Sequence, residues 1–121
     1  MNTKTRKNDL PRLKGSAMQI HPTLTGIVDR LENGGPLRIV CFGDSITGIY
    51  FHTGSRIAYP ELLGAALRRL YPASNVEVIN AGIGGDHTRA ALKRMERDVL
   101  DHQPHLVTVM FGMNDVKHAD G

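Results

Sequence analysis

The feature that most constrains the fold is a short apolar run that ends abruptly in small polar residues. Residues 39–42 are apolar and include β-branched side chains, which is typical of a strand buried on both faces of a parallel sheet. Gly43 breaks the run, and Asp44, Ser45 and Thr47 follow at once. Glycine permits a sharp turn, and open α/β sheets bind ligands beyond the carboxyl ends of their strands. We therefore predict that Ser45 is a nucleophile at such an edge.

The rest of the chain alternates between helix and strand patterns. Apolar spacing and turn signals predict a helix over 22–32, further helices beginning at Pro60 and after Asp86, and strands over 76–79 and 106–111. This order favours right-handed crossovers and a parallel sheet. We predict a flavodoxin-like three-layer α/β/α fold over residues 22–121, truncated after the third strand, preceded by a disordered basic leader over residues 1–21.

The helix after Asp86 carries both apolar and charged residues. Asp86 is a candidate N-cap for this helix. Leu92, Met95 and Val99 are predicted to form its inward face, whereas Arg94 and its charged neighbours are expected on the solvent face.

Charge and composition exclude several classes of function. Of the net charge of +3, the first 14 residues carry +4, so the remaining residues carry −1, and we predict no nucleic-acid partner. No run is long and apolar enough for a signal peptide or a membrane span. Cys41 is the only cysteine, which permits no internal disulfide, and we expect a cytoplasmic protein. No cluster has metal-ligand spacing, and we predict no metal and no cofactor.

Three loops are expected to meet at one edge of the sheet. Ser45 follows the first strand, Gly84 and Gly85 the second, and Asn114 the third. The flavodoxin-like strand order 2-1-3 would place Ser45 beside both other loops. A hydroxyl, a backbone N–H and a side-chain amide around one point could attack a carbonyl and stabilise the oxyanion that forms.

Three blocks of this sequence resemble those of the SGNH (GDSL-type) hydrolases, a family of esterases and lipases. The blocks are Phe42-Gly-Asp-Ser-Ile46, residues 80–86 and Gly112-Met-Asn-Asp115, and the resemblance runs from about residue 38 to residue 116. It implies that Ser45 is the nucleophile of an ester hydrolase. It also implies oxyanion donors, which are the N–H groups of Ser45 and Gly85 and the amide of Asn114, with support from Asp44, Thr47 and Gly84.

The resemblance also implies a general base that this sequence does not supply. The last block of the family is an Asp-x-x-His near the C-terminus of the domain, and no counterpart follows residue 116. Asp115 and His118 have the right spacing, but Asp115 belongs to the third block, and we predict that this pair is not catalytic. Ser45 without a base is a poor nucleophile, so the chain alone is expected to be inactive.

Two alternative functions are also compatible with the sequence, and several single residues have expected roles. The alternatives are a flavodoxin-like module that holds a phosphate or flavin on the loop 45–47, and a non-catalytic interaction module that uses the open edge of the third strand. Asp44 is expected to accept backbone N–H bonds, and Thr47 to bond within the same turn. His52 and His87 are interpreted as surface residues and His102 and His105 as solvated, whereas His21 lies before the domain. The ester cleaved and the oligomeric state are left open.

Overall fold

The computed structural model describes residues 22–118, so the predicted leader lies outside the described residues. The elements in chain order are α1 (Pro22–Asn33), β1 (Pro36–Gly43), the short 3-10 helix η2 (Phe51–Thr53), α2 (Tyr59–Leu70), β2 (Asn75–Gly82), α3 (Thr88–Asp98), η3 (Leu100–His102), β3 (Leu106–Met110) and η4 (Asp115–His118). The predicted alternation of helices and strands is confirmed. No helix in residues 22–118 is long and apolar enough to cross a membrane.

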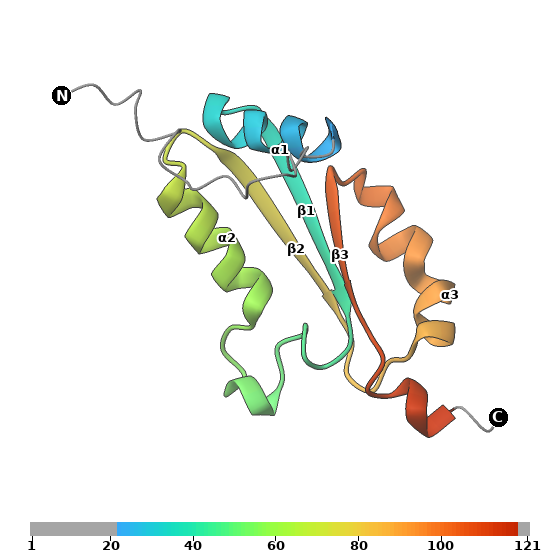
Figure 1. Cartoon of the computed structure of the whole chain (residues 1–121). Helices are drawn as coiled ribbons and strands as arrows, with labels where there is room; N and C mark the ends of the chain where they lie inside the picture. The colour runs from blue at the N-terminus through green and yellow to red at the C-terminus, as the bar shows by residue number, and fades with distance from the viewer. Residues whose placement is uncertain (1–21, 119–121) are drawn as a thin grey trace, which may run out of the picture.

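The three strands form one parallel sheet in the order β2-β1-β3. Val40 of β1 lies opposite Ile79 on one side and Val107 on the other. Figure 1 shows that the loops after all three strands lie at the same end of the sheet. The predicted strand order, with the Ser45 strand in the centre, is confirmed.

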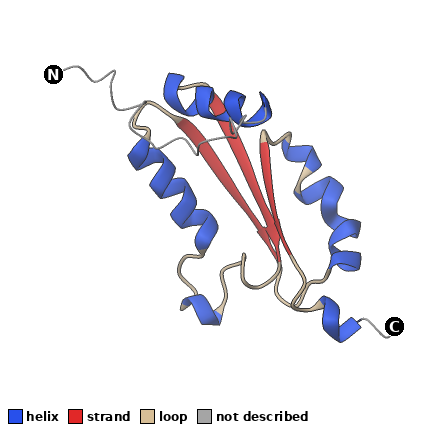
Figure 2. Ribbon diagram, in the orientation of Figure 1, coloured by secondary structure: helices blue, strands red, loops and turns tan. Residues whose placement is uncertain are grey.

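Helices cover both faces of this sheet, which makes three layers (Figure 2). Alternate residues of β1 point to opposite faces because side chains alternate along a strand. Leu37, Ile39 and Cys41 join α1 and α2 in one core, and Val40 and Phe42 join α3 in the other. The central strand is therefore buried on both faces, as its apolar run indicates, and it holds the end that precedes Ser45 rigidly.

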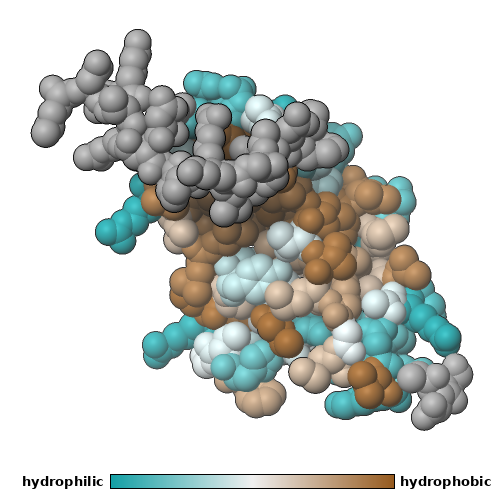
Figure 3. Space-filling model, in the orientation of Figure 1, coloured by the Kyte–Doolittle hydropathy of each residue, from teal (hydrophilic) through white to brown (hydrophobic). Residues whose placement is uncertain are grey.

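The third strand is far less covered than the first. Within the described residues β3 pairs with β1 alone, and Val109 and Met110 remain 69% and 43% exposed. Figure 3 shows apolar side chains across the middle of the molecule in the view of Figure 1. The edge of β3 is thus an open, apolar border of the described fold.

The predicted faces of α3 are right for Val99, which is 3% exposed, and wrong for Leu92, for Met95, which is 36% exposed, and for Arg94. Arg94 is only 8% exposed and Ala91 only 2%, whereas Leu92 is 64% exposed. The helical spacing identifies a stripe of residues, but Ala91 and Arg94 belong to the stripe that contacts the sheet. Arg94 can be buried there because acceptors meet its guanidinium on several sides.

Candidate active site

The loop after β1 presents Ser45 on a compact turn. The Asp44 carbonyl accepts the N–H groups of Thr47 at 3.2 Å and Gly48 at 3.0 Å, and Asp44 Oδ1 accepts the N–H of Ile46 at 2.9 Å. Asp44 is 1% exposed, so these contacts fix the turn from below. Ser45 is half-buried, and no residue in 22–118 hydrogen-bonds to its hydroxyl. The hydroxyl is therefore available to a substrate.

Thr47 turns its hydroxyl into the protein. The side chain is fully buried, and Oγ1 has no hydrogen-bond partner among the described residues. It occupies the space that a Cβ atom on Gly43 would need. The expected bond of Thr47 within the turn is made by its backbone N–H and not by its hydroxyl. Because Oγ1 faces inward, it could not bind a phosphate or flavin at the loop 45–47. This weakens the alternative of a phosphate- or flavin-binding module.

The two glycines of the loop after β2 differ in whether their N–H group is free. The N–H of Gly84 donates to the hydroxyl of Tyr50 at 2.6 Å. The N–H of Gly85 meets no acceptor within residues 22–118. Gly85 has a φ of +74°. Residues with a Cβ atom adopt this backbone conformation only at a cost in free energy. This geometry favours Gly85 over Gly84 as a donor to a ligand.

Asn80 ties the loop after β1 to the end of β2, a role that the sequence did not indicate. Its Nδ2 donates to the carbonyl of Thr47 at 2.8 Å and to Glu61 Oε1 at 3.0 Å, and its Oδ1 accepts the N–H of Gly82 at 3.0 Å. A Cβ atom on Gly82 would overlap the backbone of Gly48. The two loops therefore pack backbone against backbone.

The loop after β3 is tied to the loop after β2. Asn114 Nδ2 donates to the carbonyl of Asp86 at 2.9 Å. A primary amide carries two N–H donors, so one remains for a ligand. Asp86 is not the N-cap of α3, because that position is His87, whose side chain makes no cap hydrogen bond. Instead Asp86 is buried beside Arg94, with Oδ2 accepting from Nε at 2.8 Å.

Asp115, in the loop after β3, caps the N-terminus of α3. Its Oδ1 accepts the hydroxyl of Thr88 and, at 3.0 Å, the backbone N–H of Thr88. The hydrogen bond from the hydroxyl of Thr88 contributes most to lowering the pKa of Asp115 below its ordinary value of 3.8. The bond from the Thr88 backbone N–H and the charge of His87 lower this pKa further. The carboxylate thus contributes stability above its unfolded pKa, and this contribution is lost as the pH falls through the lower folded pKa.

Replacing Thr88 with valine is expected to raise the pKa of Asp115 toward its ordinary value, because the variant removes the strongest donor and keeps the shape. Carboxyl carbon NMR titration of the chain measures this directly. Asp98 serves as the internal control: a hydrogen bond from Arg97 lowers the pKa of Asp98, and that pKa should not move. An Asp115 that titrates identically in both proteins would contradict the capping role.

The histidines lie at or near the surface, and several of them also make specific contacts. His52 is exposed, yet its Nε2 lies 2.6 Å from the carbonyl oxygen of Ser45. A carbonyl only accepts, so Nε2 carries the proton and is not a base for the hydroxyl in this arrangement. His118 stacks on His87 with ring centroids 4.2 Å apart. His105 is half-buried, and its Nδ1 accepts the N–H of Arg38 at 2.9 Å.

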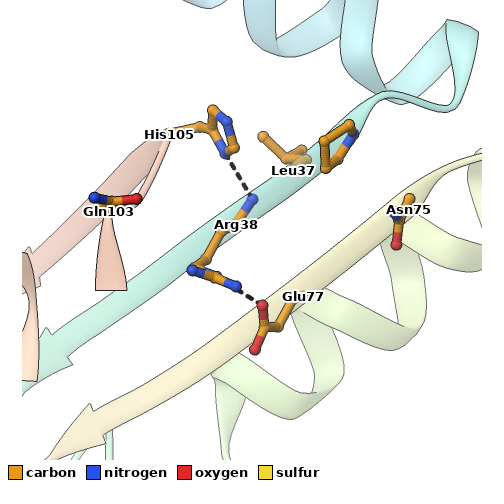
Figure 4. A pocket seen from close by; sticks show the side chains of 7 residues that line it. Leu37, Arg38, Asn75, Glu77, Gln103 and His105 are labelled. Carbon is orange, nitrogen blue, oxygen red and sulfur yellow. Dashed lines mark hydrogen bonds and ion pairs between the residues drawn. The ribbon is translucent and has the colours of Figure 1, made fainter. Parts of the chain in front are cut away.

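A hollow of about 320 Å³ lies at the opposite end of the sheet (Figure 4). Arg38 pairs there with Glu77 at 2.7 Å and donates to the carbonyl of His102 at 2.6 Å. The charged groups of this hollow satisfy one another. No group of three His, Cys, Asp or Glu residues in 22–118 is placed to hold a metal ion.

The parallel order β2-β1-β3, with Ser45, Gly85 and Asn114 after successive strands, defines a flavodoxin-like three-layer α/β protein. Within that class, the model of the GDSL-like Lipase/Acylhydrolase family matches residues 41–121. The chain belongs to this family of hydrolases.

Three known proteins illustrate the similarity. An acetylxylan esterase of Geobacillus stearothermophilus is 31% identical over 96 residues, which cover 71% of this chain and 43% of that protein. A two-domain esterase active on acetylated mannans superimposes with a TM-score of 0.70 at 30% identity, covering 77% of this chain and 25% of that one. The SGNH-hydrolase family esterase AlinE4 gives a TM-score of 0.54 at 36% identity, covering 71% and 45%. The chain spans 34% and 43% of the length of the curated relatives it matches.

Proposed function

We propose that Ser45 is the nucleophile of a serine hydrolase that cleaves a carboxylic ester by acyl transfer. The observation that carries the proposal is the central position of β1, which brings the free hydroxyl of Ser45 to the edge shared by the Gly85 and Asn114 loops. The N–H groups of Ser45 and Gly85 and the second N–H of Asn114 would stabilise the oxyanion. Preorganised donors of this kind lower the barrier because they need no reorganisation during the reaction.

The reaction proceeds in two balanced steps. The oxygen of Ser45 bonds to the ester carbonyl carbon, the carbon–alkoxy bond breaks, and the alcohol leaves with a proton delivered by the general base. Water then attacks the acyl-serine ester with help from the same base, releases the acid and restores the hydroxyl. Both steps pass through a tetrahedral oxyanion held by the same donors.

The base is proposed to lie outside the 121 residues, in an Asp-x-x-His of the complete enzyme. Within residues 22–118, no histidine hydrogen-bonds to the hydroxyl of Ser45. The Oδ1 atom of Asp115 binds Thr88 rather than His118. We therefore expect the 121-residue chain alone to have little ester turnover.

An acetyl ester on a polysaccharide is the substrate class that we propose. Two similar proteins, an acetylxylan esterase and an esterase active on acetylated mannans, support this choice. Acetate released from acetylated xylan and mannan, compared with release from a long-chain acyl ester, tests the substrate class. Faster cleavage of the long-chain ester would contradict it.

Covalent labelling tests the proposed nucleophile. Sequencing the transcript beyond the codon for Gly121 shows whether the reading frame continues to an Asp-x-x-His, and the protein expressed from the whole frame is treated with a fluorophosphonate. The hydroxyl oxygen should bond to phosphorus, fluoride should leave, and the proton should pass to the base. Mass spectrometry is expected to locate the adduct on Ser45, with far slower labelling of the 121-residue chain. An active enzyme labelled on a different residue, or not labelled, contradicts the proposal.

A further inference from the structure

Arg94 is a buried cation beneath the candidate active site. Its side chain is 9% exposed, and Asp86, which pairs with it, is 8% exposed. Charged side chains are rarely buried to this extent, because removal from water is costly unless every donor finds an acceptor. The position of Arg94 on α3 therefore calls for an explanation beyond helix packing.

The guanidinium of Arg94 joins the ends of two strands. Nη1 donates to the carbonyl of Ala81 on β2 at 2.9 Å, and Nη2 donates to the carbonyl of Gly43 on β1 at 2.9 Å. Nε binds Asp86 at 2.8 Å. Gly43 lies two residues before Ser45, and Asp86 directly follows Gly85. The guanidinium thus binds the chain just before Ser45, at Gly43, and just after Gly85, at Asp86.

Only a planar, multidentate cation can make these contacts together. Arginine presents five donors in a fixed fork, whereas lysine presents a compact point charge. The guanidinium carbon also lies over the Phe42 ring of β1, 4.6 Å from its centre. Asp98 Oδ2 accepts from Nη1 at 3.2 Å. Lysine at this position would retain the charge and lose the bridge.

We propose that Arg94 is a positioning residue that sets the separation of Ser45 from the Gly85 N–H by holding the ends of β1 and β2 together. The role rests on the proposed function, in which these two groups act on the same ester. The residue contacts no substrate and acts through the backbone carbonyls of Gly43 and Ala81. A small shift of either strand end would separate nucleophile and oxyanion donor, and misplacements of about 1 Å can cost roughly 10²-fold in rate.

The test uses backbone amide NMR of the ¹⁵N-labelled 121-residue chain, so it does not depend on ester turnover. Arg94→Lys should remain folded, should shift the amide signals of Ser45 and Gly85, and should speed hydrogen exchange at Ile83, whose N–H donates to the carbonyl of Gly43 at 3.1 Å. Arg97→Lys is the matched control, because Arg97 lies on the same helix and is exposed. Among the described residues its guanidinium pairs with Asp98 alone. Its signals at Ser45 and Gly85 should match the parent.

Chemical rescue distinguishes the hydrogen bonds of the guanidinium to the two strand ends from the effect of its positive charge. Arg94 borders a hollow of about 240 Å³ that opens beside β2, so methylguanidinium should enter the Arg94→Ala variant and restore the parent signals. Methylammonium, which carries the same charge without the fork, should not restore them. Should Arg94→Ala unfold, restoration of folding by methylguanidinium alone counts in the same way.

Two results would overturn the positioning role. One is an Arg94→Lys chain with parent-like signals at Ser45 and Gly85, and the other is equal rescue by both cations. In the complete enzyme, Arg94→Lys should lower kcat by roughly 10²-fold with little change in KM. Failure of the labelling at Ser45 would remove the hydrolase proposal and leave the NMR result on strand spacing intact.

Discussion

Replacing Ser45 with alanine in the complete enzyme should lower kcat for ester hydrolysis by at least roughly 10³-fold, because the covalent route then has no nucleophile. The loss should fall on kcat rather than on KM, since the alanine removes the reacting oxygen and little of the binding surface. Initial rates of acetate release over a range of ester concentrations measure both constants. What remains should reflect binding and the oxyanion donors alone.

Ser74→Ala is the matched control for this change. Ser74 precedes β2 at the opposite end of the sheet, and its hydroxyl has no partner among the described residues. The variant should keep the parent kcat, and both variants should keep the parent melting temperature. A Ser45→Ala enzyme with parent-like turnover would remove Ser45 from the chemistry, whatever the fold.

The strand order and the loop positions could be predicted from the sequence because they depend on local signals. The buried run 39–42 marks the central strand, and glycine at Gly43 ends it. Parallel strands place the loops that follow them at a common edge, so the convergence of the Ser45, Gly85 and Asn114 loops follows from strand order alone. The structure has that order. The roles of these residues in catalysis stay predictions.

The contacts that hold the loops could not be predicted in the same way. Apolar periodicity cannot choose between neighbouring stripes of one helix, so Leu92 was expected inside and Arg94 outside. The burial of Arg94 depends on Gly43, which is 51 residues distant in the chain. The capping of Thr88 by Asp115 spans 27 residues. Such pairs form only when the fold brings them together, and a single sequence carries no signal for them.

The hydroxyl of Tyr50 illustrates the same limit at the site itself. Tyr50 belongs to none of the three sequence blocks, yet its hydroxyl accepts the N–H of Gly84. This one contact distinguishes two adjacent glycines that the sequence motif treats almost alike. The preference for Gly85 that the resemblance implies is therefore supported by a side chain that lies 34 residues from Gly84 along the chain.

Replacing Asp86 with alanine is expected to lower the free energy of unfolding of the chain by about 3–5 kcal/mol, because the variant leaves the buried charge of Arg94 without its anion. This is a large part of the stability of an ordinary domain, which is about 5–15 kcal/mol. Urea unfolding followed by circular dichroism gives the difference. Asp98 remains to compensate part of the charge, which favours the lower end of the range.

Glu77→Ala is the comparison for an exposed ion pair. Glu77 and Arg38 are 57% and 42% exposed, and loss of such a pair costs about 0–1 kcal/mol. Arg94→Met combined with Asp86→Ala should recover part of the loss, because neither charge then remains buried alone. Equal losses for Asp86→Ala and Glu77→Ala would contradict the burial of the pair. A double variant no more stable than Asp86→Ala would show instead that the cost lies in the carbonyls of Gly43 and Ala81, which each lose the donor that Arg94 supplies, although Gly43 keeps the N–H of Ile83.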